Sequence, residues 1–412
     1  MIRDFRRRAL MGAGLAALGA GAARGQSTPF ATGAGIRPIG RYDLDRLARI
    51  TGPELRAFMA SSTLPSAYEG RFPPPRHAVD LFQVTYRSVV PERGNAPTIA
   101  SGLVALPDSG ARQLPLLSYQ HGTVFDRGYV PSNPDASMET RLMLAAFASQ
   151  GYAVMGADYF GRGASTLPDS YLVAGSTRQA NLDMLLATRD LLAARGIGVT
   201  RFFLSGWSQG GWVTMQHLRN LERHGLAPRA AAVASAPVDI YLTMNRWMGN
   251  PQPVDAVYLP GVVAIQMGAQ AHYHRQDGLL EAALPPAFVA PSRALHASAM
   301  AWEDFLAATT PRLADFIRPE FRATGAAGDA PYWQVLRAAE AYQWKSATPL
   351  RVYTGGQDEV TPRSVGGLPE ATQRLLGGAP VRTIDAGDRA DHRAVFVHGI
   401  LDQKPWFDAM LA

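Results

Sequence analysis

The fold of this 412-residue chain is decided by one short stretch, Leu204-Ser205-Gly206-Trp207-Ser208-Gln209-Gly210-Gly211. The stretch contains the pattern G-x-S-x-G, with Ser208 at its centre. A strand-like run over 201–204 comes before it, and an amphipathic helical pattern over 209–223 follows it. In this context the pattern predicts a strand that turns sharply into a helix and exposes the serine hydroxyl at the turn. Glycines suit such a turn because a Cβ at those positions would clash with neighbouring atoms.

Strand and helix patterns alternate on both sides of this turn. The strand patterns cover 79–90, 98–106, 114–119, 152–157, 201–204, 230–235, 350–353 and 381–384. The helix patterns cover 138–149, 176–195, 209–223, 368–376 and the chain from about residue 392. We expect the first two strands to pair as a hairpin across 91–97. The alternation predicts an α/β fold whose mostly parallel central sheet is flanked by helices.

Two segments depart from this alternation. Residues 238–347 hold helix-like pieces near 262–274, 302–309 and 331–344, and we interpret this segment as a helical cap insert. Residues 26–40 are rich in Gly, Ser, Thr and Pro, which is typical of a linker. Residues 41–60 are compatible with one or two helices. We therefore expect a linker and helical segment over 26–75, followed by the main domain over 76–412.

The first 25 residues have the pattern of a secretion signal. Three arginines at 6–8 precede a short apolar run, rich in Ala and Gly, over 9–18. This order is typical of an export signal, and the arginine pair resembles a twin-arginine signal. The run is too short for a transmembrane helix, and no later segment approaches 18 uninterrupted apolar residues. We expect an exported protein, periplasmic or extracellular, without an integral membrane segment after signal removal.

Charge and composition exclude several classes of function. The formal net charge is +6, but five Arg and one Asp in the first 25 residues account for +4 and leave +2 for the remainder. No later basic run with interleaved aromatics follows, so we expect no nucleic-acid partner. The chain has no cysteine, which excludes disulfides, Cys-ligated zinc and thiol chemistry.

A metal site has only one weak candidate. His272 and His274 form an H-x-H pair, but residues two apart on a helix do not share a face. No carboxylate pattern completes a ligand set around them. We therefore expect neither a metal nor another cofactor.

A nucleophilic serine needs a general base, and the base needs an orienting carboxylate. Asp358 lies just past the carboxyl end of the strand predicted at 350–353. Glu359 is the neighbour to exclude, since its side chain would point elsewhere if Asp358 points in. His392 follows the last predicted strand and opens the last predicted helix. His398 is the rival base, but it falls inside that helix. We favour Asp358 and His392.

An oxyanion formed at this serine would need two hydrogen-bond donors. One candidate is the backbone amide of Gln209, the residue after the nucleophile. The other should come from the loop that follows the strand at 114–119. Thr123 is the first choice there, with Gly122 next. We expect His121 to brace this loop rather than act as the base, because it precedes the serine in the chain.

Five motifs in chain order carry a family resemblance. They are Tyr119-Gln120-His121-Gly122-Thr123, the Gly156–Ser165 segment, the Gly206–Gly211 turn, the Gly356–Pro362 segment and Asp391-His392. Over about 76–412 the chain resembles the α/β-hydrolase superfamily, in particular secreted bacterial lipases and esterases. The resemblance does not extend to the insert at 238–347.

The resemblance implies a catalytic triad of Ser208, Asp358 and His392, with the loop at 158–165 helping to build the floor of the site. It implies a carboxylic ester hydrolase that acts through an acyl-enzyme on a small-molecule or lipid ester, without a cofactor. Two alternatives stay open: a peptidase or amidase on the same scaffold, and a non-catalytic binding protein with this fold. Fold alone does not choose the substrate.

Overall fold

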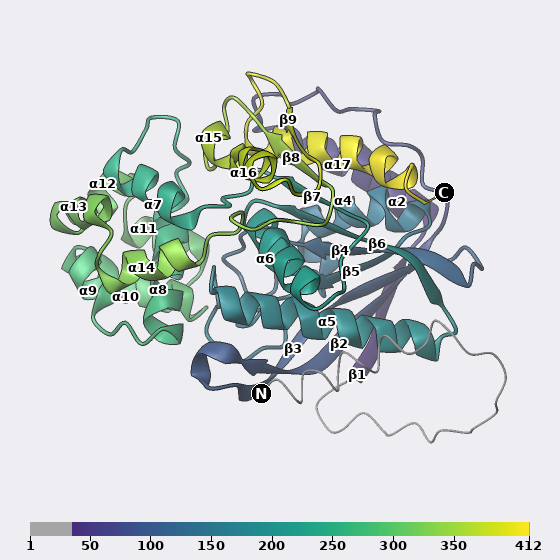
Figure 1. The fold of residues 1–412 in the computed structure, drawn as a ribbon, viewed down its shortest axis with the longest axis horizontal. Helices are drawn as coiled ribbons and strands as arrows, with labels where there is room; N and C mark the ends of the chain where they lie inside the picture. The colour runs from purple at the N-terminus through teal and green to yellow at the C-terminus, as the bar shows by residue number, and fades with distance from the viewer. Residues whose placement is uncertain (1–34, 412) are drawn as a thin grey trace.

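The computed structural model describes residues 35–411, and Figure 1 shows a single sheet with helices on both faces. Across the described sheet the nine strands follow the order β1-β2-β3-β5-β4-β6-β7-β8-β9. Their bounds are β1 (Gly35–Tyr42), β2 (Val79–Val90), β3 (Ala96–Pro107), β4 (Gln113–Gln120), β5 (Ala153–Ala157), β6 (Gly198–Trp207), β7 (Ala230–Ala234), β8 (Leu350–Thr354) and β9 (Val381–Asp385). The export signal predicted over 1–25 lies outside the described residues.

The larger part of the sheet is parallel. Strands β5, β4, β6, β7, β8 and β9 each run parallel to the next. The carboxyl ends of parallel strands meet at one edge of a sheet, so the segments after β4, β6, β8 and β9 come together there. This confirms the predicted mostly parallel sheet and gathers the predicted site segments at one edge.

The other part of the sheet is antiparallel. Strands β2 and β3 pair from Val79 opposite Pro107 to Val90 opposite Ala96, which confirms the predicted hairpin. Strand β3 then pairs antiparallel with β5 and so joins the hairpin to the parallel strands.

The prediction that 26–40 is a linker was wrong from residue 35 onward. Residues 35–42 form the edge strand β1, antiparallel to β2. The register shifts between Pro38 and Gly40, and Gly40 has φ 152°. An edge strand tolerates a proline, and a bulge tolerates a glycine, so a real strand here has the composition of a linker.

Helices cover both faces because the central strands are apolar on both sides. Leu116 of β4 belongs to the buried cluster that includes Met215, whereas the next residue, Leu117, belongs to the cluster that includes Val397. Outside the cap the helices are α2 (Leu44–Arg49), α3 (Leu55–Met59), α4 (Met138–Ala146), α5 (Ala174–Ala194), α6 (Gln209–Arg223), α15 (Arg363–Gly366), α16 (Leu368–Leu376) and α17 (His392–Asp408). Single turns of π or 3₁₀ helix lie at Ile50–Glu54, Pro91–Arg93, Pro134–Ala136 and Ala148–Gln150.

Between β7 and β8 the chain leaves the sheet and forms helices α7 to α14, which we call the cap segment (residues 240–338). These are α7 (Ile240–Gly249), α8 (Leu259–Tyr273), α9 (Leu279–Ala283), α10 (Pro286–His296), α11 (Trp302–Ala308), α12 (Leu313–Phe316), α13 (Pro319–Ala327) and α14 (Pro331–Ala338). They gather at one end of the sheet in Figure 1. Helix α14 ends before the pattern predicted to 344, because the Glu340 carboxylate accepts the amides of Tyr342 and Gln343 in a turn.

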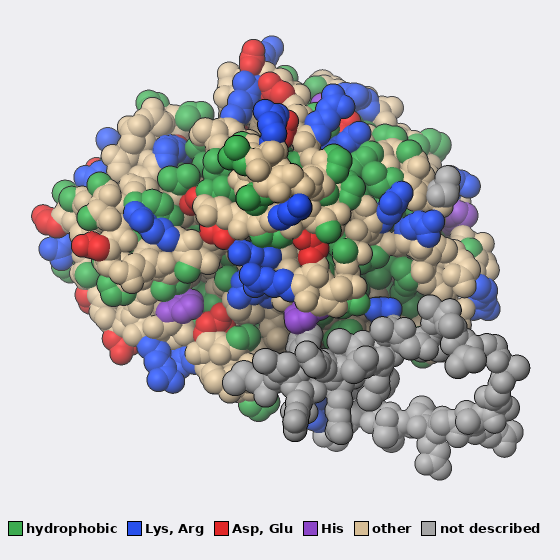
Figure 2. Space-filling model, viewed as in Figure 1, with side chains coloured by type: hydrophobic (Ala, Val, Ile, Leu, Met, Phe, Trp, Pro, Cys, Tyr) green, Lys and Arg blue, Asp and Glu red, His purple; other side chains and the backbone are tan. Residues whose placement is uncertain are grey.

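The cap segment has no separate core. Val263 and Trp333 of the cap belong to the same buried cluster as Met215 of α6. No helix in residues 35–411 combines the length and the apolarity needed to cross a membrane. Figure 2 shows positive and negative side chains interspersed over one face of the molecule.

Candidate active site

Ser208 lies at the turn between β6 and α6, as the pattern predicts. Its backbone has φ 57° and ψ −126°, and its amide donates to the carbonyl of Ala234 at 2.9 Å. A positive φ is uncommon for a residue with a side chain and marks local strain. Gly206 and Gly210 are required there, because a Cβ on either would collide with backbone oxygens of the turn or of Gln120. The turn therefore holds the side chain of Ser208 clear of both β6 and α6.

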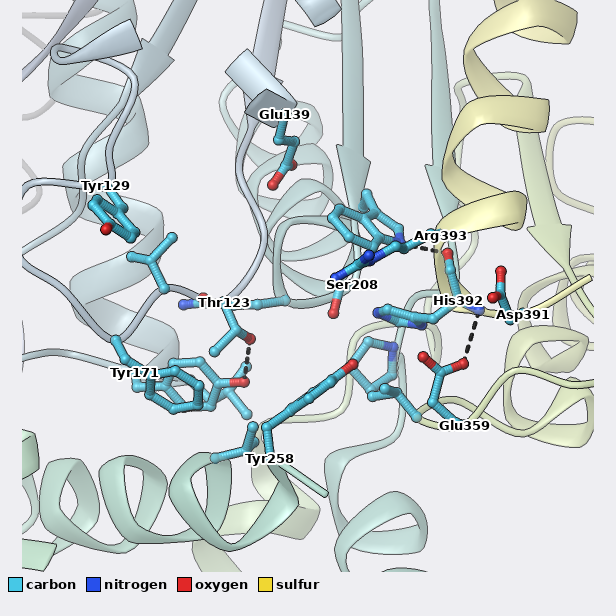
Figure 3. Close-up of a pocket in the computed structure, with 18 of the residues that line it drawn as sticks. Thr123, Tyr129, Glu139, Tyr171, Ser208, Tyr258, Glu359, Asp391, His392 and Arg393 are labelled. Atoms are coloured by element: carbon cyan, nitrogen blue, oxygen red, sulfur yellow. Dashed lines mark hydrogen bonds between the residues drawn. The ribbon is translucent and has the colours of Figure 1, made fainter. Parts of the chain in front are cut away.

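A cavity of about 580 Å³ lies beside Ser208. Its wall includes His392, Thr123 and Gln209 from the predicted site. The other lining side chains come from the sheet loops, the N-terminal helical segment and the cap, and include Phe58, Phe125, Tyr129, Met138, Glu139, Tyr171, Leu172, Trp207, Ile240, Met244, Trp247, Tyr258, Val262, Glu359 and Arg393. In Figure 3 Ser208 and His392 lie next to each other at the centre of this cavity.

His392 and Asp358 form a buried pair. The Nδ1 atom of His392 lies 2.9 Å from Oδ1 of Asp358. The same oxygen accepts the amides of Val360 at 3.0 Å and Thr361 at 2.8 Å, which fix the carboxylate after β8. A carboxylate on Nδ1 sets the tautomer and leaves Nε2 as the nitrogen available to the serine.

The start of α17 sets the place of His392. Asp391 caps this helix by accepting the amide of Ala394 at 2.9 Å. Its carboxylate also accepts the hydroxyl of Ser62 at 2.8 Å and the amide of Thr63 at 2.7 Å. The segment before the main domain thus holds the turn that carries the histidine, although its sequence gave no sign of this.

The charges of the pair stabilise each other. Burial alone would raise the pKa of Asp358, but the charge and hydrogen bond of His392 hold that pKa below its ordinary value. Burial alone would lower the pKa of His392, but the charge and hydrogen bond of Asp358, with the charges of Glu359 and Asp391, raise it. The site therefore favours an imidazolium that forms during a reaction.

Two rival residues have other roles. Asp358, not Glu359, lies beside Nδ1 of His392, and the Glu359 carboxylate instead accepts the backbone amide of His392 at 3.0 Å (Figure 3). The ring of His398 packs edge-on between Tyr68 and Tyr353, with centroids 6.4 and 6.2 Å away. His398 is therefore a packing residue within α17.

The loop after β4 brings Thr123 to the cavity. Its hydroxyl lies 2.7 Å from the Tyr171 hydroxyl. The amide of Gly122, the second choice of donor, is occupied, because it donates to both oxygens of Glu139 at 3.0 Å. Thr123 and Gln209 both line the cavity beside Ser208.

His121 braces this loop. Its ring is buried and stacks on Tyr159, with centroids 4.2 Å apart and planes inclined by 16°. Its Nδ1 atom lies 2.8 Å from the carbonyl oxygen of Gly122. Burial lowers the pKa of His121 to about 4, so the ring is neutral at neutral pH.

The loop at 158–165 supports the site from below. All its residues are described and none lines the cavity directly, so its contribution to the floor of the site is indirect, through Arg162, which holds the carbonyls of the lining residues Val124 and Phe125. Asp158 accepts the Ser101 hydroxyl at 2.6 Å and the Ser132 amide at 2.9 Å. Arg162 forms a buried ion pair with Asp169 at 2.6 Å.

Several lining residues carry no sequence signal for a site. In the sequence Glu139 is an ordinary acidic residue in the first turn of α4, where its charge interacts favourably with the helix dipole. Tyr258 and Trp247 belong to the cap, and Phe58 belongs to the N-terminal helical segment. Their place in the cavity follows from tertiary packing, which no local pattern encodes.

The arrangement offers a strained serine, an imidazole, a buried carboxylate and backbone amides around one cavity. This set can support attack of a hydroxyl on an acyl carbon. Within residues 35–411, His, Asp and Glu side chains form no group of three that could hold a metal ion.

The chain matches no family model and no curated protein sequence. Its fold is similar to that of a putative hydrolase from Legionella pneumophila, at 22% identity, with a TM-score of 0.79, over 92% of this chain and 97% of that one. It is also similar to the rice cell wall degrading esterase LipA from Xanthomonas oryzae, at 21% identity, with a TM-score of 0.78, over 91% and 98%. Candida antarctica lipase A in its closed state gives 17% identity and a TM-score of 0.61, over 81% and 77%. The chain therefore has the α/β-hydrolase fold.

Proposed function

We propose that this protein is a serine hydrolase that cleaves carboxylic esters, with Ser208 as nucleophile, His392 as base and Asp358 as the orienting carboxylate. One observation carries the proposal. Ser208, at a positive-φ turn, lines the same cavity as His392, and Nδ1 of His392 is hydrogen-bonded to the buried carboxylate of Asp358. The structural similarity to a hydrolase, an esterase and a lipase supports the same class of reaction.

The reaction has two steps. Nε2 of His392 takes the proton of Ser208 as Oγ attacks the ester carbonyl, and the amides of Thr123 and Gln209 bind the tetrahedral oxyanion. The imidazolium gives its proton to the departing alkoxide and leaves an acyl-serine. Water then attacks this acyl group with His392 as base again, which releases the acid and restores the serine. No step needs a cofactor.

The cavity wall indicates the kind of ester. A volume of about 580 Å³ and mostly apolar lining suit a small-molecule or lipid ester with an apolar group. We place the protein outside the cytoplasm on the strength of its N-terminal pattern, and we regard the segment at 238–347 as the cap that shapes the pocket.

A fluorophosphonate labelling experiment tests the proposal. We expect mass spectrometry to find a single adduct on Ser208 in the folded protein, and none in Ser208→Ala or after denaturation. Nitrophenyl esters should be hydrolysed by the wild type and not by Ser208→Ala, whose fold is checked by circular dichroism. Turnover by that variant within about tenfold of wild type would contradict the assignment.

A further inference from the structure

Glu139 is a buried carboxylate whose contacts the reaction above does not use. It lies in the first turn of α4 and lines the same cavity as Ser208. Both of its oxygens lie 3.0 Å from the amide nitrogen of Gly122, the residue before Thr123. In Figure 3 its side chain reaches down from α4 toward the loop that carries Thr123.

Gly122 is packed tightly between two neighbours. A Cβ at this position would lie 3.2 Å from Oε2 of Glu139 and 3.4 Å from the Trp207 ring. The Glu139 carboxylate and the Trp207 indole therefore leave little room beside the Gly122 backbone. Glu139 thus holds the peptide between His121 and Gly122, and Nδ1 of His121 lies 2.8 Å from the Gly122 carbonyl oxygen, in the peptide that leads into Thr123.

The chain after Thr123 is fixed as well. Arg162 donates to the carbonyl oxygen of Val124 at 2.8 Å and to that of Phe125 at 3.1 Å. Its ion pair with Asp169 holds the guanidinium in place. A negative group thus holds the amide before Thr123, and a positive group holds the carbonyls after it.

We propose that Glu139 is a positioning residue that fixes the amide of Thr123 as an oxyanion donor, by holding the preceding amide of Gly122. The inference rests on the proposed function. A hydrogen bond to a carboxylate is shorter and stronger than one to a neutral acceptor. Such a bond suits a loop that must keep the Thr123 amide directed at the oxyanion during the reaction. A donor displaced by a fraction of an ångström stabilises the oxyanion less, although substrate still binds.

The groups around Glu139 make this contact sensitive to pH. Burial raises the pKa of Glu139 to about 7, against the hydrogen bond from the Gly122 amide and the charge of His392. Burial also keeps the phenols of Tyr119 and Tyr159 protonated by raising their pKa well above the ordinary value. Near neutral pH Glu139 therefore changes between a carboxylate that accepts with two oxygens and an acid that accepts with one.

Two variants and one control test the inference. Glu139→Ala removes the acceptor, and Glu139→Gln keeps one neutral acceptor of the same shape. Glu222→Gln is the matched control, because Glu222 also accepts a backbone amide, that of Ala347 at 2.9 Å, but does not line the cavity. Each protein is assayed for ester kcat and KM, and for binding of an alkyl trifluoromethyl ketone, which Ser208 converts into an anionic hemiketal.

We expect kcat to fall about 10- to 100-fold in Glu139→Ala and less in Glu139→Gln, while KM changes by less than about threefold. Affinity for the trifluoromethyl ketone should fall in parallel with kcat, and Glu222→Gln should match the wild type. The acid limb of the wild-type pH–rate profile should be steeper than that of Glu139→Gln, which lacks one titrating group.

Wild-type kcat and ketone affinity in Glu139→Gln, with an unchanged acid limb, would overturn the inference while leaving the esterase intact. If Glu139→Ala does not fold, these measurements on Glu139→Gln decide the matter. Absence of Ser208-dependent turnover in the wild type would overturn the proposed function and this inference together.

Discussion

The cavity has two unlike walls, one built by the sheet and one built by the cap. On the sheet side Ser208, Thr123 and His392 follow the ends of β6, β4 and β9, and hydrogen bonds from backbone amides hold the neighbouring carboxylates of Glu139 and Asp358. On the cap side Met244 and Val262 contribute buried apolar surface. Because one wall carries the polar groups and the other is apolar, we expect the two walls to control different properties of the reaction. Sheet-side changes should alter the rate of chemistry, and cap-side changes should alter which ester is preferred.

The largest expected effect comes from the sheet side, at Asp358. Asp358→Asn keeps the shape of the side chain but removes the charge that orients and stabilises the imidazolium of His392. We expect kcat to fall by about 10³- to 10⁴-fold with little change in KM. Steady-state kinetics on a nitrophenyl ester, with circular dichroism to confirm folding, make the measurement.

Asp255 of the cap provides the matched control. Its carboxylate accepts the amide of Gln252 at 2.7 Å and pairs with Arg246, but it does not line the cavity. Asp255→Asn should keep kcat within about twofold of wild type, as substitutions away from a site usually do. If kcat fell equally in Asp255→Asn and Asp358→Asn, the loss could not be assigned to the sheet-side wall of the cavity.

The buried Glu139 on the sheet side should also make the stability of the protein depend on pH. Glu139 has a folded pKa raised from 4.5 to about 7 by burial, so the folded state binds the proton more tightly than the unfolded chain does. The resulting stabilisation is present in full below pH 4.5 and is lost as pH rises through 7. Relative to Glu139→Gln, the free energy of unfolding of the wild type should fall by about 3 kcal/mol over this range. Urea unfolding at several pH values tests this, and parallel pH curves for the two proteins would contradict it.

The two walls also differ in how much of them the sequence predicts. Ser208, Asp358 and His392 each lie in the segment that follows a strand pattern, so their meeting at one sheet edge could be predicted from local signals. Glu139 could not, because its contact with Gly122 depends on how α4 packs against a loop 17 residues earlier.

The cap wall and the edge strand escaped prediction for related reasons. Met244 and Val262 show only that their helices are apolar, not which face meets the cavity. In β1, Pro38 and Gly40 give a linker-like composition to an edge strand with a bulge. Local patterns identify elements that are regular in both composition and geometry, and they fail where tertiary packing selects a face or an edge.

The smallest expected effect tests the cap side through two methionines of α7. Met244 and Met248 are equally buried, but only Met244 is among the residues that line the described cavity. Met244→Ala enlarges the cavity by about the volume of the lost side chain, so esters with longer apolar groups should fit better. We expect the ratio of kcat/KM for long over short acyl esters to rise about tenfold, since each accommodated methylene contributes about 1 kcal/mol or more.

Met248→Ala separates this effect from destabilisation. Both substitutions delete a buried side chain of the same size from the same helix, and both should lower the free energy of unfolding by about 2–5 kcal/mol. Because Met248 does not reach the cavity, Met248→Ala should leave the acyl-length ratio at the wild-type value. A shift of that ratio in both variants would mean that loosening of the cap, rather than the shape of its wall, sets the preference. A shift in neither would place the apolar group of the ester away from the cap, toward Phe58 of the N-terminal helical segment and Met138 of α4.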